Sequence, residues 1–322
     1  MALSVQAQLN KWGSEKTPFV FLIDFECQKP RCWSLNEPIN DFKYNFNGFT
    51  NITPNTPSQD IVDTTFEIKK NPISFESYQQ KFDFVKSQIE YGNSFLVNLT
   101  APTKIATNLS LDYIAHHATS KYVCYLVDQF VSYSPETFIQ INNGKIVAYP
   151  MKGTIDGAIP NAEALILSDT KELAEHATIV DLIRNDLSKV ATNVRVSKYR
   201  YYEHIETQQG AIGQVSSSIE GTLPPEYPSN IGDLIFDLLP AGSVSGAPKN
   251  KTKEIIAEAE QLERGYYTGV AGYFDGTNLD SCVLIRYLQA DNRYRSGGGI
   301  TAQSIALNEY EEMINKVYVP TF

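Results

Sequence analysis

Apolar residues recur along the chain with two different spacings, which predict both helices and strands. Between Ser74 and Gly92 they recur every three or four positions, as on one face of a helix, with the serine as N-cap and the glycine at the end. Residues 161–190 show the same spacing and are rich in Ala, Leu and Glu. Further helices are predicted over 231–239, 247–263 and 305–317.

Runs of β-branched and aromatic residues predict the strands. The run 18–25 (PFVFLIDF) indicates a buried strand, whereas the Pro- and Asn-rich stretch 29–60 is expected to be mostly loops. Strand-like runs separated by Ser-Pro and Asn-Asn-Gly predict a β-meander over 122–149, with a hairpin at the second turn. Other strands are predicted over 94–100, 269–273 and 281–288. Because strands and helices mix without regular βαβ alternation or a linker, the pattern favours one large α+β unit.

The composition is that of an ordinary globular protein with an excess of acidic residues. Of 322 residues, 42% are hydrophobic and 20% are charged, which permits a large core and excludes a disordered chain. The net charge of -10 argues against nucleic acid as a partner. No signal-peptide pattern or membrane-length apolar run occurs, so we expect a cytoplasmic protein with no membrane partner. The four cysteines fit no zinc motif and are expected to be reduced thiols.

Two glycine-containing segments could approach a ligand through their backbone. The segment 240–251 (PAGSVSGAPKNK) either forms a tight turn between helices or presents N–H groups to an anion at the start of the next helix. It is not a P-loop, because GxxxxGK[ST] is absent. Three consecutive glycines at 297–299 indicate close approach to a ligand or to another strand. The sequence leaves these alternatives open.

Several charged residues could bind or react, and each also has a simpler explanation. Arg286 lies in an apolar, strand-like run and needs an anion, either a structural carboxylate or a substrate. Two glutamate pairs with i, i+3 spacing each share a helix face, which could hold a divalent cation or face solvent. The pairs are Glu172 with Glu175 and Glu309 with Glu312. Lys152 is a candidate nucleophile if it is desolvated, and Glu136 is a candidate general acid if it is buried.

The usual signatures of several enzyme classes are absent. The four histidines form no HExxH or other ligand pattern, and neither GxSxG nor GxGxxG occurs. The sequence therefore gives no support to a metallohydrolase, a serine hydrolase or a dinucleotide-dependent enzyme.

Seven motifs follow one another between Ser74 and Lys316. They are SPETF (134–138), PMKGT (150–154), KELAEHATIVDLIRNDLSKV (171–190), PAGSVSGAPK (240–249), ERGYYTGVAGYF (263–274), LIRY (284–287) and SGGGI (296–300), the last with a downstream ExxE and Lys316. In this order they resemble the chorismate-utilising enzymes, which include anthranilate, aminodeoxychorismate, isochorismate and salicylate synthases. The run 18–26 resembles the shortened start of small aminodeoxychorismate synthase component I proteins.

The resemblance implies one large chorismate-utilising domain of α+β class, with β-sheets packed face to face and helices on the outside. Residues 1–73 would form a shortened N-terminal segment integrated into the sheet core, and residues 74–322 would form the chorismate-binding catalytic domain. Nothing in the chain resembles the Cys-His-Glu triad of an amidotransferase. Ammonia is therefore expected from a separate glutamine amidotransferase subunit.

The resemblance also implies a magnesium site and a substrate site. Glu175 and Glu312 would hold one Mg²⁺, with Glu172 and Glu309 as outer partners, and the ion would clamp the ring carboxylate of chorismate. Arg286 would pair with the enolpyruvyl carboxylate. The residues implied to complete the substrate site are Gly153, Thr154, Tyr267, Gly298, Gly299 and Lys316.

Lys152 distinguishes between the reactions of this family. A lysine in PMKGT resembles the enzymes that make 4-amino-4-deoxychorismate, whereas anthranilate synthases tend to have alanine there. The implied mechanism is attack by Lys152 on C2 of chorismate while Glu136 protonates the departing C4 hydroxyl, then addition of ammonia at C4 with expulsion of the lysine. The expected function is that of an Mg²⁺-dependent aminodeoxychorismate synthase component I in p-aminobenzoate and folate synthesis.

Four positions depart from the family's pattern. Met151 replaces the usual isoleucine, which conserves volume, and Tyr287 replaces a frequent threonine. Gln214 stands where histidine is usual and cannot shuttle a proton, which disfavours anthranilate synthase. Leu96 stands where isochorismate and salicylate synthases have a lysine base, which disfavours those activities. The alternatives left open are anthranilate synthase component I and a chorismate-binding protein without catalytic activity.

Overall fold

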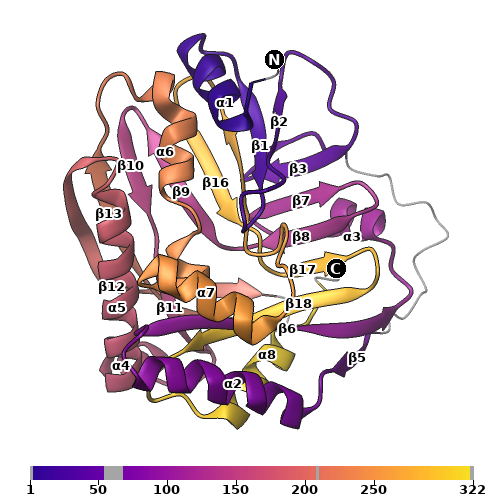
Figure 1. Cartoon of the computed structure of the whole chain (residues 1–322), viewed down its shortest axis with the longest axis vertical. Helices are drawn as coiled ribbons and strands as arrows, with labels where there is room; N and C mark the ends of the chain where they lie inside the picture. The colour runs from indigo at the N-terminus through magenta and orange to yellow at the C-terminus, as the bar shows by residue number, and fades with distance from the viewer. Residues whose placement is uncertain (1–2, 54–67, 208–209, 320–322) are drawn as a thin grey trace. The chain divides into compact units, whose positions relative to one another are not determined.

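The computed structural model describes residues 3–53, 68–207 and 210–319, and Figure 1 shows the arrangement of its helices and strands. The chain is 31% helical and 36% strand, and its strands form two antiparallel sheets. This confirms the predicted α+β class. Within the three described ranges, no helix is both long and apolar enough to cross a lipid bilayer.

The chain folds into two compact units, each assembled from three stretches of sequence. Unit 1 comprises Met1–Phe19, Thr137–Ser243 and Tyr273–Ser281, and unit 2 comprises Val20–Glu136, Val244–Gly272 and Cys282–Phe322. Three of the passages from one unit to the other fall inside strands, namely β1 (Phe19–Ile23), β15 (Val270–Phe274) and β16 (Leu279–Val283). The units follow spatial contacts, so the division of function at residue 73 stays a prediction.

Unit 1 is built on an antiparallel sheet with the strand order β11-β13-β10-β9-β16, and β12 pairs with β13. The strands are β9 (Thr137–Asn142), β10 (Lys145–Ala148), β11 (Met151–Asp156), β12 (Thr192–Thr207) and β13 (Gly210–Thr222). The helices are α1 (Val5–Ser14), α4 (Ala162–Ser168), α5 (Thr170–Leu187) and α6 (Ile231–Asp237). Asn143 and Gly144 have φ values of 50° and 76°, so the predicted hairpin joins β9 to β10. Helix α5 packs against β11, β12 and β13.

Unit 2 contains a complete antiparallel sheet with the strand order β14-β6-β18-β17-β8-β7-β3-β4, and β5 pairs with β6. Its strands are β3 (Phe42–Phe46), β4 (Phe49–Thr50), β5 (Ile68–Pro72), β6 (Leu96–Thr107), β7 (Tyr122–Leu126), β8 (Phe130–Ser134), β14 (Gly246–Ala247), β17 (Tyr287–Gln289) and β18 (Arg293–Ile300). The helices are α2 (Phe75–Glu90), α3 (Leu111–His117), α7 (Lys249–Glu260) and α8 (Ala306–Asn315). The short strand β2 (Arg31–Ser34) pairs with β1.

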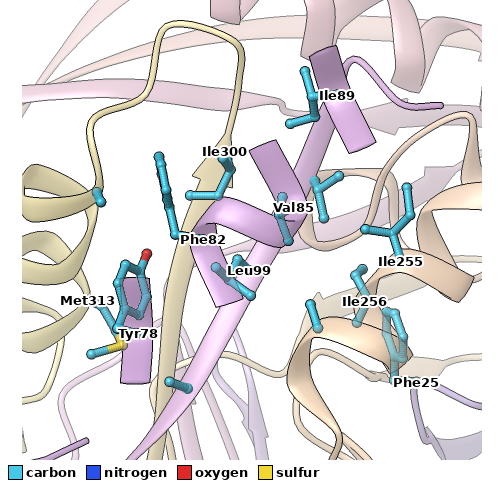
Figure 2. Close-up of a cluster of buried hydrophobic side chains, with 14 residues drawn as sticks. Phe25, Tyr78, Phe82, Val85, Ile89, Leu99, Ile255, Ile256, Ile300 and Met313 are labelled. Carbon is cyan, nitrogen blue, oxygen red and sulfur yellow. The ribbon is translucent and has the colours of Figure 1, made fainter. Parts of the chain in front are cut away.

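The apolar face predicted for residues 75–89 forms a core of unit 2. Tyr78, Phe82 and Val85 of α2 lie in one buried cluster with Leu99 of β6 and Met313 of α8 (Figure 2). Helices α2, α7 and α8 contact one another or the central strands β6 and β18. This packing fixes α8 against β18, the strand that carries the three glycines.

Truncation of the Phe82 side chain should strongly destabilise this core. It is 3% exposed, so Phe82→Ala is expected to lower the free energy of unfolding by about 3–5 kcal/mol, through lost burial and a residual cavity. Tyr91 at the end of the same helix is 83% exposed, and Tyr91→Ala should change stability by less than about 0.5 kcal/mol. Urea denaturation of both variants measures the difference. Equal effects would contradict the placement of Phe82 in the core.

One local prediction is wrong, and two features are not predicted. Most of residues 29–53 lie outside strands, as predicted, but the stretch also holds the short strands β2, β3 and β4, whose mixed polarity gives no strand pattern; positions 54–60 of that prediction lie outside the described residues. The predicted meander over 122–149 is two hairpins, β7–β8 in unit 2 and β9–β10 in unit 1. The long hairpin β12–β13 is not predicted, since none of the side chains described in β12 is buried and apolar alternation is weak there.

Candidate active site

Lys152 lies on β11 and forms an ion pair with helix α5. Its Nζ lies 2.8 Å from Oε2 of Glu175, and the side chains are 28% and 9% exposed. Strand β11 pairs with β13 and packs against α5, so the strand fixes the Lys152 backbone and the helix fixes Glu175. The structure therefore brings the predicted nucleophile together with a predicted metal ligand.

Glu172 stands one turn earlier on α5 and faces the residue after Lys152. A Cβ atom on Gly153 would lie 3.0 Å from Glu172 Oε2, and Gly153 has a φ of +92°, which side-chain-bearing residues rarely adopt. Glycine is thus required here by both the backbone conformation and the close approach. Thr154 follows on β11, is exposed, and pairs across the ladder with Gln214.

A buried histidine on α5, His176, is connected by hydrogen bonds to the strand that carries Lys152. His176 is fully buried next to Glu175, and its Nε2 lies 2.6 Å from Oγ of Ser217. The Ser217 N–H donates to the carbonyl of Pro150, the first residue of PMKGT, at 2.9 Å. Burial lowers the pKa of His176, and the backbone of Lys152 opposes that shift. His176 is not predicted from the sequence because it belongs to no metal pattern, although its position beside Glu175 is a usable signal.

Gln214, one of the departures from the family's pattern, lies beside the PMKGT strand. Its Nε2 lies 2.8 Å from Sδ of Met151 and 3.3 Å from Oγ of Ser216. Ser216 in turn donates to the carboxylate of Glu203 on β12. A side-chain amide held in this way can orient neighbouring groups but cannot exchange a proton near neutral pH.

In unit 2, helix α8 places Glu309 and Glu312 over the glycine strand β18. A Cβ atom on Gly298 would lie 3.3 Å from Glu309 Oε2 and 3.6 Å from Glu312 Oε1. Lys316 Nζ lies 2.6 Å from Glu312 Oε1 and donates to the carbonyl of Gly297 at 2.9 Å. Both carboxylates and the ammonium therefore converge on the backbone of the glycine strand.

The three glycines lie within β18. Gly299 is paired with Asn98 and Gly298 with Leu99 of β6. A Cβ atom on Gly297 would overlap the carbonyl oxygen of Leu99. Close approach to another strand, one of the two alternatives for this segment, is thus confirmed, and approach of a ligand stays a prediction.

The four glutamates form two separate pairs. Glu172 and Glu175 belong to unit 1, and Glu309 and Glu312 belong to unit 2. Among the residues that the structure describes, no group of three or more His, Cys, Asp or Glu has metal-binding geometry. The donors are nevertheless the carboxylate oxygens that Mg²⁺ prefers, and Glu175 and Glu309 are only 9% and 7% exposed. The chemistry of each pair fits the predicted ion, which stays a prediction.

Arg286 stands in a break between β16 and β17, not inside one strand as predicted. It has a φ of 52°, and the chain passes at this point from one sheet to the other. Its Nε lies 3.3 Å from the Tyr318 hydroxyl, and its guanidinium lies 5.5 Å from the centre of that ring. No carboxylate of the described residues forms an ion pair with it. The guanidinium is therefore able to receive an anion.

Tyr267 is a buried phenol of unit 2. Burial raises its pKa to about 12, although Arg264 and Arg295 oppose the shift. Its ring lies 5.7 Å from that of Tyr287, which stacks on Phe130 at 4.5 Å. At neutral pH the hydroxyl keeps its proton and can donate a hydrogen bond to an anion.

Glu136 is half-buried and lies between β8 and β9. Its N–H donates to Oγ of Ser134 at 3.1 Å, and its carbonyl accepts from the N–H of Val283 at 3.1 Å. The N–H of Tyr133 donates to the carbonyl of Arg286 at 3.2 Å. Glu136 thus lies along the chain segment that carries Arg286, and its role as a general acid stays a prediction.

A buried network built on Glu260 was not predicted. Its carboxylate accepts from Arg264 through Nε at 3.0 Å and Nη2 at 2.5 Å, and from the N–H and hydroxyl of Thr100, both at 2.9 Å. Arg264 also donates to the carbonyl of Asn98 at 2.7 Å. Glu260 also has i, i+3 spacing to the exposed Glu263, a spacing that is typical of a solvated helix face. The i, i+4 spacing of Glu260 and Arg264 is the signal that was available.

Comparison with known proteins identifies the family. The chorismate binding enzyme family matches residues 20–321. An uncharacterised PabA-like protein of Haemophilus influenzae is 48% identical over 317 residues, which cover 97% of this chain and 95% of that protein. Anthranilate synthase component 1 of Acetivibrio thermocellus is 34% identical over 277 residues, 78% of this chain and 55% of the relative, so the chain spans about half the length of that relative.

A solved structure agrees with these matches. The crystal structure of anthranilate synthase component I from Streptococcus pneumoniae has a TM-score of 0.64 and 28% identity, over 79% of this chain and 59% of that one. All thirteen residues predicted for the site lie within the range that the family matches. The chain therefore belongs to the chorismate binding enzyme family.

Proposed function

We propose that the chain is component I of an aminodeoxychorismate synthase, which converts chorismate and ammonia to 4-amino-4-deoxychorismate. The observation that supports this most is Lys152, because its amine lies 2.8 Å from Glu175 and its strand is fixed by α5 and β13. The ion pair positions the amine, and attack requires its unprotonated form. The pathway would be that of p-aminobenzoate and folate.

The reaction would proceed through a covalent lysine adduct. The unprotonated amine of Lys152 attacks C2 of chorismate, both ring double bonds shift, and the C4 hydroxyl leaves as water with a proton from Glu136. Ammonia then adds at C4, both double bonds shift back, and Lys152 leaves from C2 with its bonding electron pair. Two allylic displacements replace one difficult substitution. The enolpyruvyl group is kept throughout.

The anionic groups of chorismate would be bound by residues that the family's motifs select. Arg286 and the protonated hydroxyl of Tyr267 would bind the enolpyruvyl carboxylate. The ring carboxylate would lie near the glycine backbone at 298–299, with Lys316, Gly153 and Thr154 completing the substrate site. A bound Mg²⁺, held by Glu175 and Glu312 with Glu172 and Glu309 behind them, would supply charge neutralisation at the ring carboxylate.

Ammonia would be supplied by a separate glutamine amidotransferase subunit. The support is that no Cys-His-Glu triad of an amidotransferase is recognisable in the sequence. Free ammonia at high concentration is expected to replace the partner in solution.

Anthranilate synthase component I is a second candidate, favoured by the relative that is 34% identical. That reaction adds elimination of pyruvate and aromatisation of the ring, which require another proton transfer. Gln214, held by Met151 and Ser216, has no proton to exchange at neutral pH. We therefore favour release of 4-amino-4-deoxychorismate.

The test is product identification. The purified protein is incubated with chorismate, Mg²⁺ and high ammonia at alkaline pH, and the products are identified by mass, with and without a lyase that converts 4-amino-4-deoxychorismate to p-aminobenzoate. The proposal expects p-aminobenzoate only when the lyase is present. Anthranilate as the main product would establish the second candidate, and binding of chorismate without turnover would identify a non-catalytic chorismate-binding protein.

A further inference from the structure

Two buried guanidiniums of unit 2, those of Arg264 and Arg295, share one carboxylate. Arg264 and Arg295 are both 2% exposed, and the carboxylate nearest to both belongs to Glu260. Glu260 is already occupied, since it accepts two hydrogen bonds from Arg264 and two from Thr100. The positive charge of Arg295 is therefore only weakly balanced by a carboxylate.

The contacts of Arg295 show how weak this compensation is. Its Nη2 lies 3.8 Å from Glu260 Oε2, and its Nη1 donates to the carbonyl of Glu263 at 3.3 Å. Its Nε has no hydrogen-bond partner within the ranges that the structure describes. Burial accordingly lowers the pKa of Arg295, although the guanidinium stays charged at neutral pH. Burying an incompletely paired charge lowers the stability of the fold, so a purely structural role does not explain why Arg295 is there.

Arg295 is directed at Tyr267. Its guanidinium lies 5.2 Å from the centre of the Tyr267 ring, within the range of a cation–π contact. On the neighbouring strand, Tyr287 pairs with Arg295 in the ladder, and its ring lies 5.7 Å from that of Tyr267. Tyr267 is therefore held between a cation and an aromatic ring, and Arg286 is a further charge that acts on it.

We propose that Arg295 is a positioning residue that sets the affinity for the substrate's second carboxylate, by holding Tyr267 and by placing an incompletely paired positive charge behind it. The inference rests on the proposed function, in which Tyr267 and Arg286 bind the enolpyruvyl carboxylate of chorismate. Arg295 acts through Tyr267 and belongs to none of the seven motifs that predicted the site.

The test measures binding of chorismate to the full chain by calorimetry, with Mg²⁺ and without ammonia. Arg295→Met keeps an unbranched apolar chain and removes the guanidinium with its charge, and it is expected to weaken binding by roughly ten- to a hundredfold. Arg295→Lys keeps the charge and should bind more tightly than Arg295→Met. The matched control is Arg293→Met on the same strand, whose partner is the exposed Asp291 at 2.5 Å, and it should bind as the wild type does.

Two readouts separate positioning from a merely structural role. Glu260 keeps Arg264 when Arg295 is replaced, so Arg295→Met should leave the thermal midpoint unchanged or raise it while affinity falls. In a cycle with Tyr267→Phe, the double variant should bind little worse than the weaker single variant, because both act on one contact.

The outcomes are distinct. If the wild type does not bind chorismate, the proposed function fails. If the wild type binds and Arg295→Met binds equally well, the inference is overturned while the function stands. Full additivity in the cycle, or Arg295→Lys binding no better than Arg295→Met, would also overturn it.

Discussion

Replacing Lys152 by alanine is expected to lower the rate of 4-amino-4-deoxychorismate formation by roughly three to six orders of magnitude. Alanine cannot form the bond to C2 on which the proposed mechanism depends, and no other group in that mechanism can take its place. The rate is measured by mass spectrometry with saturating ammonia and Mg²⁺. Circular dichroism of the variant checks that the fold is kept, which we expect because the Lys152 side chain is 28% exposed.

A matched lysine and an adduct measurement sharpen this test. Lys145 lies exposed at the start of β10 in the same unit, and Lys145→Ala should keep the wild-type rate. With chorismate and no ammonia, the wild type should accumulate an adduct heavier by one chorismate less one water, and Lys152→Ala should form none. An unchanged amination rate in Lys152→Ala would refute the covalent mechanism without refuting amination.

The parts of the fold that the sequence predicts well are those fixed by local interactions. The helix expected between Ser74 and Gly92 is α2, and Oγ of Ser74 accepts the N–H of Ser77 at 3.2 Å as an N-cap should. The hairpin at Asn143 and Gly144 is equally local. Strands β12 and β13 pair with each other along most of their length. Because backbone hydrogen bonds stabilise this pair, its sequence needs no strong apolar pattern.

In the candidate site, too, the sequence predicts the residues but not the contacts that depend on packing. The motifs select Lys152 and Glu175, but their ion pair depends on how α5 packs against β11, which spacing along the chain cannot give. The role of Arg286 as a cation in need of an anion follows from the sequence, whereas its position in a break between two sheets does not. Arg295 is invisible to motif reasoning, because its burial arises from the pairing of β17 with β18 and the packing of Tyr267.

Glu260→Ala is expected to lower the free energy of unfolding by about 3–5 kcal/mol. The substitution leaves two guanidiniums, both 2% exposed, without their carboxylate, and it also removes the acceptor of the Thr100 N–H and hydroxyl. Chemical denaturation gives the measurement. The matched control is Glu254→Ala on the same helix, where an exposed ion pair with Lys251 should contribute less than about 1 kcal/mol.

A double variant separates the cost of unpaired charge from the loss of the network itself. Glu260→Ala combined with Arg264→Met removes both members of the closest ion pair, so it should recover part of the stability lost in Glu260→Ala alone. If Glu260→Ala were as stable as Glu254→Ala, Glu260 would not be the counter-charge of Arg264. The inference that Arg295 lacks a full counter-charge would then fail, because it assumes that Arg264 occupies Glu260. The measurement therefore also tests the proposed role of Arg295 at Tyr267.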